Sequence, residues 1–275
     1  MGAKVYITTD LEGASGVTQE SQSFGERYES ARLQLTRDVN AVVLGAQDAG
    51  ADHILVSDGH GHNAGYNFVY EELANGALYE LGAPRPCYIA GLTSSFTCAF
   101  AVAYHAMAGT KGAIMDHTQS SRAIVHMWLN DQEIGELGMF AYAAGHVNVP
   151  VALVTGDDKT AEEAKALLGE QVVTAVVKYG AKRTSAFCLA PGDARALIRE
   201  KAAEAVRLAP NMKPLKAPEG ECVLRVEYLR SEMCEGFWAR TDVEMVDART
   251  VIFRRKNALD VMNAYCGLHY PPVAP

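Results

Sequence analysis

The sequence predicts an α/β fold, with a mostly parallel central sheet flanked by helices and a smaller C-terminal α/β part. First, a strand-like segment at 4–9, a helix-like segment at 28–46 and a strand-like segment at 53–57 form a strand–helix–strand unit, which requires a parallel sheet. Second, apolar runs at 99–104 and 150–155 continue this pattern. Third, strands become less regular after about residue 158, so we expect two domains, 1–158 and 159–275.

The elements of the N-terminal part follow from side-chain type and spacing. Residues 4–9 are β-branched and aromatic, which favours a strand. Residues 28–46 carry apolar side chains three or four positions apart and end before Gly50, which is typical of an amphipathic helix and its stop. We expect further strands at 53–57, 99–104 and 123–129 and a short one at 87–90; Asn130 and Asp131 end the 123–129 strand with a turn.

The C-terminal part mixes helices and strands. Residues 135–144 suit a helix despite their glycines, and 150–155 suit a strand. Thr160 and Glu163 have the spacing of a capping box, in which each side chain bonds the backbone of the other residue, so we expect a helix to begin at Thr160. Strands are expected at 172–178, 222–228 and 251–254, and a long helix at 192–208. The three prolines of 210–220 indicate a surface loop.

Composition and charge exclude several classes of protein. Of the 275 residues, 49% are hydrophobic and 21% charged, which is enough to bury a core. The net charge of −8 argues against a nucleic-acid binder and against attachment to anionic membranes by charge. No apolar run reaches the ~18 residues of a spanning helix and the N-terminus does not look like a signal peptide, so we expect a soluble, cytoplasmic protein. The six cysteines form no C-x-x-C pair and are expected to be free thiols.

Polar side chains follow three of the predicted strands. Asp10 and Glu12 come after the first strand, Asp58 and His60 after the second, and His105 after the 99–104 run. The carboxyl ends of parallel strands open on one edge of a sheet, so these residues are expected to converge. Two carboxylates brought together repel each other unless a cation neutralises them. Imidazoles added to carboxylates form a mixed nitrogen and oxygen set that suits Zn²⁺ or a similar divalent ion.

Two further residues are candidates for this site. Glu136 lies in the first turn of the 135–144 helix, where a carboxylate can point back toward the sheet edge; five ligands with one shared carboxylate would suit two metal ions. His117 follows His105 by twelve residues and is a candidate for proton transfer or for stabilising a tetrahedral intermediate. The sequence has no H-E-x-x-H, P-loop or G-x-S-x-G motif, which argues against several other enzyme classes.

The ordered set of motifs resembles the D-aminopeptidase (DppA) family of zinc metallopeptidases. The order and rough spacing hold from residue 4 to residue 158, over half of the chain. The likeness is thinner beyond that point. The matching pieces are TDLEGASG at 9–16, VSDGH at 56–60, YHA at 104–106, MDH at 115–117, ND at 130–131, GELG at 135–138 and VTGDD at 154–158.

This resemblance implies a complete catalytic site and an assembly. It places a two-zinc site in the 1–158 domain, with Asp10 as the bridging ligand, and gives the catalytic role to His117. It also implies removal of N-terminal D-amino acids from short peptides, and a ring-like homo-oligomer, a decamer that encloses a chamber. The metal ligands that it implies are Asp10, Glu12, His60, His105 and Glu136.

Two other functions are weighed against the aminopeptidase. One is a two-metal amidohydrolase acting on a small non-peptide amide or lactam, because Asp116 adds a charge beside His117 and residues 62–90 match the family poorly. Asp116 would hold a substrate ammonium group or orient His117. The other is a metal-holding assembly protein without turnover. Asp58 is a candidate to orient a metal-bound imidazole, and His62 to lie next to one. His53, His126, His146 and His269 are expected to be structural.

Overall fold

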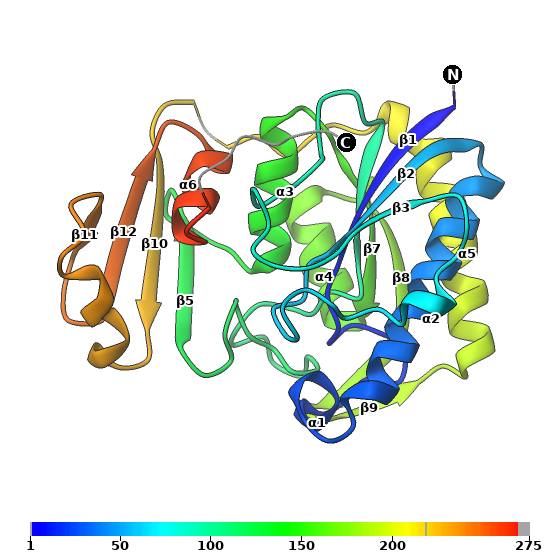
Figure 1. Cartoon of the computed structure of the whole chain (residues 1–275), viewed down its shortest axis with the longest axis horizontal. Coiled ribbons are helices and arrows are strands. Elements are labelled where there is room, and N and C mark those ends of the chain that lie inside the picture. The colour runs from blue at the N-terminus through cyan, green and yellow to red at the C-terminus, as the bar shows by residue number, and fades with distance from the viewer. Residues whose placement is uncertain (1, 218, 269–275) are drawn as a thin grey trace.

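A seven-stranded sheet forms the centre of the computed structural model, which describes residues 2–217 and 219–268 (Figure 1). Its order is β3-β2-β1-β4-β7-β8-β9, and every pair is parallel except β8 with β9. This confirms the predicted fold class. The strands are β1 (Ala3–Thr9), β2 (Ala51–Asp58), β3 (Leu78–Glu80), β4 (Cys98–Val102), β7 (Val151–Asp157), β8 (Val173–Lys182) and β9 (Ser185–Cys188).

Helices cover both faces of this sheet (Figure 1). On one face α2 (Tyr28–Asp48) packs against α5 (Pro191–Leu208), and their apolar side chains form one core with β1 and β4. On the other face α3 (Glu136–His146) and α4 (Asp158–Leu168) bury a second core against the same strands. The sheet is apolar on both sides, as parallel sheets between helical layers are.

A smaller antiparallel sheet lies beyond α3, on the side away from α2 and α5 (Figure 1). Its order is β11-β12-β10-β5-β6, and α6 (Ala258–Tyr265) packs between it and α3. The strands are β5 (Ile124–Leu129), β6 (Gln132–Glu133), β10 (Cys222–Tyr228), β11 (Val243–Met245) and β12 (Thr250–Arg255). Each sheet takes strands from both sides of residue 158, so the division into 1–158 and 159–275 stays a prediction about folding units.

Short helices complete the described part of the chain. They are α1 (Glu20–Phe24) and the 3-10 helices η1 (Tyr70–Glu72), η2 (Ala209–Asn211) and η3 (Ser231–Phe237). The expected loop at 210–220 comes after α5, and residue 218 of this loop lies outside the described residues. His269, which was expected to be structural, also lies outside them. None of the helices in residues 2–217 and 219–268 is long and apolar enough to cross a membrane. All six cysteines are free, as predicted.

Two local predictions were wrong. Residues 87–90 form a buried turn, and the edge strand is β3 instead, because this apolar segment packs beneath the sheet rather than pairing with it. The capping box at Thr160 is absent. Helix α4 begins at Asp158, and the Asp157 carboxylate caps it by accepting from the backbone N–H of Thr160 at 2.7 Å. Glu163 accepts from the N–H of Met107, also at 2.7 Å, so tertiary contacts displace the local motif.

The strand order reverses its direction between β1 and β4. The chain runs outward from β1 through β2 to β3, then returns to β4 on the other side of β1 and continues to β7 and β8. In open parallel sheets a ligand binds at such a reversal, outside the carboxyl ends of the strands. The residues that follow β1 and β4 include Asp10 and His105, so these two candidates lie at the edge of the sheet where a ligand is expected to bind.

Candidate metal centre

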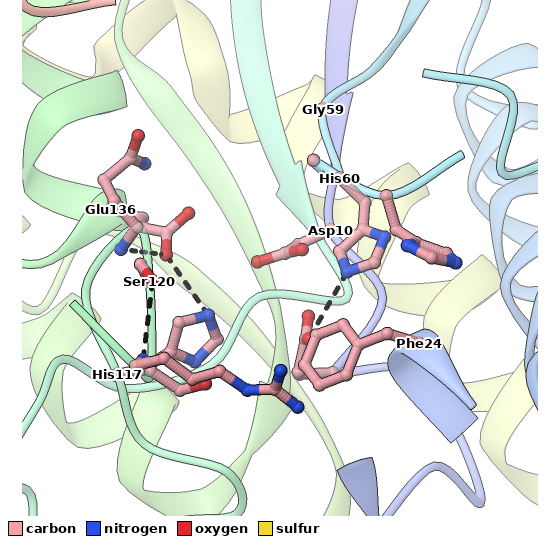
Figure 2. Close-up of a pocket in the computed structure, with 13 residues that line it drawn as sticks. Asp10, Phe24, Gly59, His60, His117, Ser120 and Glu136 are labelled. Carbon is pink, nitrogen blue, oxygen red and sulfur yellow. Dashed lines mark hydrogen bonds and ion pairs between the residues drawn. The ribbon is translucent and has the colours of Figure 1, made fainter. Parts of the chain in front are cut away.

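All six predicted site residues lie at this edge of the sheet, and Figure 2 labels Asp10, His60, His117 and Glu136 among them. Asp10 and Glu12 follow β1, His60 follows β2, and His105 follows β4. Glu136 is the first residue of α3, and His117 belongs to the loop that precedes β5. Four of them are buried: Glu12 is 1% exposed, His105 2%, Asp10 6% and His60 7%. Chain segments far apart in sequence therefore supply one buried polar cluster.

The imidazoles and carboxylates contact one another directly. His105 Nε2 lies 3.1 Å from Asp10 Oδ2 and 3.2 Å from Glu136 Oε1. His60 Nε2 lies 3.3 Å from Glu12 Oε1, and His117 Nε2 lies 3.6 Å from Glu136 Oε1. Figure 2 shows Asp10 and His60 on one side of the cluster and Glu136 and His117 on the other. The predicted convergence of residues 10 and 105 is thus observed.

A glycine lets the ends of β1 and β2 approach closely enough to bring His60 to Glu12. A Cβ on Gly59 would lie 2.3 Å from the carbonyl oxygen of Thr9, a distance that no side chain tolerates. Gly59 therefore permits the end of β2 to press against the end of β1. His60 follows directly, and its side chain reaches Glu12 on the neighbouring strand exit.

Each of the three histidines turns the same ring nitrogen into the cluster. The Nδ1 atoms face oxygen acceptors: His60 faces Asn67 Oδ1 at 3.2 Å, His105 the carbonyl of Ala106 at 3.0 Å, and His117 the carbonyl of Met115 at 2.7 Å. An Nδ1 that donates to a carbonyl leaves Nε2 with a free lone pair. Ligating histidines in metalloproteins are held in this way.

Asp58 supports His60 through an intermediate residue. Its carboxylate accepts from the backbone N–H and the side-chain amide of Asn67, at 2.5 and 2.8 Å, and Asn67 Oδ1 faces His60 Nδ1. Tyr28 also donates to Asn67 Oδ1. Sequence reasoning pointed to Asp58 but missed Asn67, which lies in the irregular segment between η1 and β2. The sequence signal that could have found it is an asparagine between two aromatic residues, Tyr66 and Phe68; in the structure Asn67 is 0% exposed.

Burial and charge strongly perturb the ionisable groups. Burial, together with the negative charge of Glu12, raises the pKa of Asp10 to about 6. Burial also favours the neutral form of Glu136, but His105 outweighs it and the pKa of Glu136 falls to about 2. The pKa of Glu12 lies well below its usual range, since His60 overcomes the effect of burial. In return, Glu12 raises the pKa of His60 to about 10 against the effect of burial. Such opposed shifts in one cleft are typical of functional sites.

The cluster contains lone pairs that the protein leaves unused. Among the described residues, Asp10 Oδ2, Glu12 Oε2 and His105 Nε2 are buried without a hydrogen-bond partner. An unsatisfied buried polar atom costs about 1–3 kcal/mol, so three in one place call for a ligand. Two overlapping sets each bring their donor atoms within 4.8 Å of one another: Asp10 with Glu12 and His105, and His105 with His117 and Glu136. Carboxylate oxygens and imidazole nitrogens fit zinc.

Backbone conformations uncommon for residues other than glycine occur in the loops that carry the site. Ala103, Met115 and Gln119 have φ angles of 58°, 49° and 61°. Ala103 comes just before His105, and Met115 just before His117. The N–H of Gln119 donates to Glu136 Oε1 at 2.7 Å, which orients that carboxylate. Strained backbone of this kind persists where surrounding structure fixes a functional geometry.

A cavity of about 340 Å³ opens onto the cluster. Asp10, Glu12, His60, His117 and Glu136 line its inner part. The remaining wall includes the side chains of Phe24, His62, Ser120, Ser121 and Arg122. Figure 2 shows Phe24 on the His60 side and Ser120 near Glu136 and His117. Such a volume suits a small molecule or a short peptide rather than a folded protein.

Asp116 is engaged outside this cavity. Its carboxylate accepts from the N–H of Gly109 at 2.9 Å and pairs with Arg183 Nε at 3.2 Å. Neither a hold on a substrate ammonium nor a direct bond to His117 agrees with these contacts. The Asp116 carboxylate therefore gives no support to the alternative of an amidohydrolase acting on a non-peptide amide. His62, by contrast, does lie near the cluster: it lines the cavity, and its ring centroid is 6.3 Å from that of His60.

Comparisons with known proteins match D-aminopeptidases over nearly the whole chain. A sequence profile of the family described as D-aminopeptidase (Peptidase M55) matches residues 3–266. A D-aminopeptidase from Bacillus subtilis (strain 168) is 34% identical over 268 residues, covering 95% of this chain and 94% of the relative. A solved structure described as the Zn-dependent D-aminopeptidase DppA from Bacillus subtilis, a self-compartmentalizing protease, is 32% identical. It superposes with a TM-score of 0.88 over 96% of each chain.

Proposed function

This chain belongs to the D-aminopeptidase family (Peptidase M55), and on that basis we propose that it is a two-zinc aminopeptidase releasing N-terminal D-amino acids from short peptides. The observation that carries the proposal is the cluster of three carboxylates and three imidazoles, four of them buried, in which buried donor atoms without partners lie close together. A relative of similar length with 34% identity is named for this activity, and a relative of solved structure is described as Zn-dependent.

Five residues would hold the metal ions: Asp10, Glu12, His60, His105 and Glu136. Asp10 is the proposed bridging ligand, because its buried carboxylate lies between the Glu12 side and the Glu136 side of the cluster. Bound zinc polarises the carbonyl of a scissile bond and makes water a competent nucleophile at neutral pH. The surrounding fold keeps this site buried and the three Nε2 atoms in place, which is the protein's own contribution.

His117 is the proposed catalytic residue. Its Nδ1 donates to the Met115 carbonyl, so Nε2 faces the cavity and can accept or return a proton. The ring stacks on that of His105 with centroids 3.8 Å apart and planes 12° apart, which fixes its orientation. Glu136 Oε1, at 3.6 Å, stabilises the imidazolium that forms when His117 takes a proton.

Metal content and stereochemistry test the proposal together. The full chain is loaded with zinc, freed of excess metal and measured by elemental analysis, then assayed with D-Ala-D-Ala and L-Ala-L-Ala. We expect two zinc ions per chain, turnover of the D-peptide and loss of that turnover on chelation. Absence of stoichiometric metal, or of D-peptide turnover at saturating zinc, contradicts it. Preference for N-terminally blocked amides supports the amidohydrolase instead.

Substitution of His117 separates a proton-transfer role from a ligand role. His117→Ala is expected to lower kcat by about 10²–10⁴ while two zinc ions remain bound. His126→Ala is the matched control, because His126 is an exposed β5 histidine paired with Glu133. If His117→Ala binds less zinc, His117 is a ligand and the catalytic assignment is wrong.

We also propose a homo-oligomer, with the decamer as the expected size. The solved relative is described as self-compartmentalizing, and this chain covers nearly all of it. Light scattering coupled to size-exclusion chromatography gives the mass directly. A mass near ten times 29.6 kDa supports the decamer, and a monomer contradicts the assembly.

A further inference from the structure

We propose that Arg122 is a specificity-determining residue that binds the carboxylate of the residue following the scissile bond. The cavity then selects dipeptides with a free C-terminus over longer or blocked peptides. This inference rests on the proposed aminopeptidase function, since it assigns the recognition of a substrate at the same cavity. It concerns a side chain outside the metal cluster.

Arg122 lies on the same loop as the proposed catalytic residue. The loop runs from His117 to the start of β5 at residue 124, and both Arg122 and His117 line the cavity. Its backbone is held locally: the N–H of Arg122 donates to Ser120 Oγ at 3.4 Å, and the N–H of Ser120 donates to the Thr118 carbonyl at 2.7 Å. The backbone that carries the Arg122 guanidinium is therefore fixed in position on the loop that also carries His117.

The guanidinium of Arg122 has no acidic partner among the described residues. Most other arginines there form ion pairs; Arg183 with Asp116 and Arg199 with Asp48 are examples. Within residues 2–217 and 219–268, no hydrogen bond or ion pair involves the Arg122 side chain. Its fork of N–H donors is the geometry that pairs with a carboxylate through two parallel hydrogen bonds. Arg122 is thus free to bind one.

Phe24 positions this guanidinium. The Arg122 Cζ atom lies 5.8 Å from the centroid of the Phe24 ring, within the range of a cation–π contact. The same ring stacks on the ring of His60, with centroids 6.4 Å apart and planes 15° apart. A proposed metal ligand, an aromatic ring and a cation therefore form one row along the cavity wall. A face contact leaves the N–H groups at the edge of the guanidinium available.

Charge and size identify the ligand as a carboxylate close to the scissile bond. Among the described residues that line the cavity, Arg122 is the only lysine or arginine; the other ionisable groups there are carboxylates and histidines. In a peptide whose scissile carbonyl is held at the cluster, the Cα atoms on the two sides of the scissile bond are about 3.8 Å apart. In a dipeptide that Cα carries the terminal carboxylate. A cavity of about 340 Å³ is near the lower end of ligand sites, roughly 300–1,000 Å³, and matches a dipeptide.

The test compares two substrates that differ only in the terminal group. Zinc-loaded wild-type protein, Arg122→Ala and Arg122→Lys are assayed with D-Ala-D-Ala and with its C-terminal amide. We expect wild type to favour the acid by about tenfold or more in kcat/KM, mainly through KM. Arg122→Ala should reduce this ratio to within about twofold of one, and Arg122→Lys should retain part of it, since an ammonium keeps the charge but not the fork.

The ratio is internal to each variant, so general damage to folding or metal binding cancels. Arg199→Ala is the matched control, because Arg199 is an exposed, ion-paired arginine on α5 outside the cavity, and it should keep the wild-type ratio. Equal use of acid and amide by wild type, or an unchanged ratio in Arg122→Ala, overturns the inference while leaving the aminopeptidase intact. Hydrolysis of neither compound by wild type refutes the proposed function itself.

Discussion

Lys178 is a fully buried lysine whose ammonium is bound by the loop that carries the first two proposed ligands. Its Nζ donates to the carbonyl oxygens of Glu12, Ala14 and Val17. The three N–H donors of an ammonium are thus used by one segment of chain. Burial lowers the pKa of Lys178 to about 8, so the group is expensive to bury and is retained by these three acceptors. Lys178 thereby fixes the path of the loop and the direction of the Glu12 carboxylate.

Removal of the Lys178 ammonium should weaken the metal site without touching a ligand. In Lys178→Met the three carbonyls lose their donor, and we expect zinc affinity to fall by about 10–100-fold, as it does when groups that orient ligands are removed. Competition with a fluorescent zinc chelator measures the affinity. Lys165→Met, at an exposed position on α4, should bind zinc like wild type. An unchanged zinc affinity in Lys178→Met would show that the loop after β1 keeps its conformation without the Lys178 ammonium.

Glu163 makes the free energy of unfolding of the metal-free protein depend on pH. Burial raises the pKa of its carboxyl from 4.5 to about 7, and the hydrogen bond from Met107 only partly opposes this. Between pH 4.5 and 7 the folded state therefore binds more protons than the unfolded state. The free energy of unfolding falls as the pH rises through that window.

Glu163→Gln should remove this loss, because the amide oxygen still accepts from Met107 but carries no charge. Since the side chain is only partly buried, we expect a gain of about 1–2 kcal/mol over wild type at pH 8 and none below pH 4.5. Urea unfolding of the chelated protein at both pH values measures it. Glu162→Gln, with its side chain 65% exposed, is the control. A gain of equal size at both pH values would mean that charge is not the cause.

Individual residues of the proposed site could be predicted where a polar side chain closely follows a recognisable strand. Asp10, Glu12, His60 and His105 meet this condition, and the structure brings them together. Asn67 does not, because it lies in an irregular segment and acts only through contacts made in the folded chain. Arg122 is exposed and has no sequence pattern of its own; its significance depends on the cavity around it.

The turn after β2 is the element on which the cluster depends most directly. Gly59→Ala places a Cβ against the Thr9 carbonyl, so the ends of β1 and β2 must separate and move His60 away from Glu12. We expect a loss of about 1–3 kcal/mol in stability and weaker zinc binding. Gly61→Ala is a matched control, since a Cβ there meets nothing within 4 Å. Thermal unfolding and metal titration of both variants check this, and equal effects in the two would contradict it.

Regular elements were predictable from periodicity, whereas their partners were not. The strand at 222–228 and the helices at 28–46 and 192–208 have the spacing of side chains that one buried face requires. Periodicity does not say which strand lies alongside. The strand at 123–129 therefore gave no sign that it pairs with β10, nearly a hundred residues later. At 87–90 an apolar run packs as a turn because β3 already occupies the sheet edge.

For the whole molecule, metal binding should be a major source of stability. The cluster buries carboxylates whose mutual repulsion a cation would relieve, and it leaves three donor atoms unpaired. A ligand that binds only the folded state adds about 2.7 kcal/mol at one hundred times its Kd. For a chain of 275 residues that corresponds to a rise in Tm of about 5 °C.

Differential scanning fluorimetry with zinc and with chelator measures this rise. Asp10→Asn should abolish most of it, since the variant loses the charge of the proposed bridging ligand. Asp116→Asn, whose carboxylate lies outside the cavity and pairs with Arg183, should keep it. A Tm independent of zinc in the wild-type protein would contradict the metal site.

The overall architecture was predictable in class but not in layout. Strand–helix–strand repeats require a parallel sheet, and alternation of strands and helices after residue 158 indicated a second α/β part. The actual second sheet recruits β5 and β6 from the first part, while β8 and β9 extend the first sheet. Such exchange depends on which faces remain apolar after the helices have packed, and a single sequence does not reveal it.

The hairpin of β5 and β6 has a mechanical consequence for the molecule. This segment leaves the cluster after His117, pairs with β10 in the outer sheet, and returns to begin α3 at Glu136. The outer sheet thus helps to fix the spacing of the segments that carry His117 and Glu136, two of the proposed site residues. A chain truncated before β10 would keep every one of the six polar groups yet lose the scaffold that holds two of them in register.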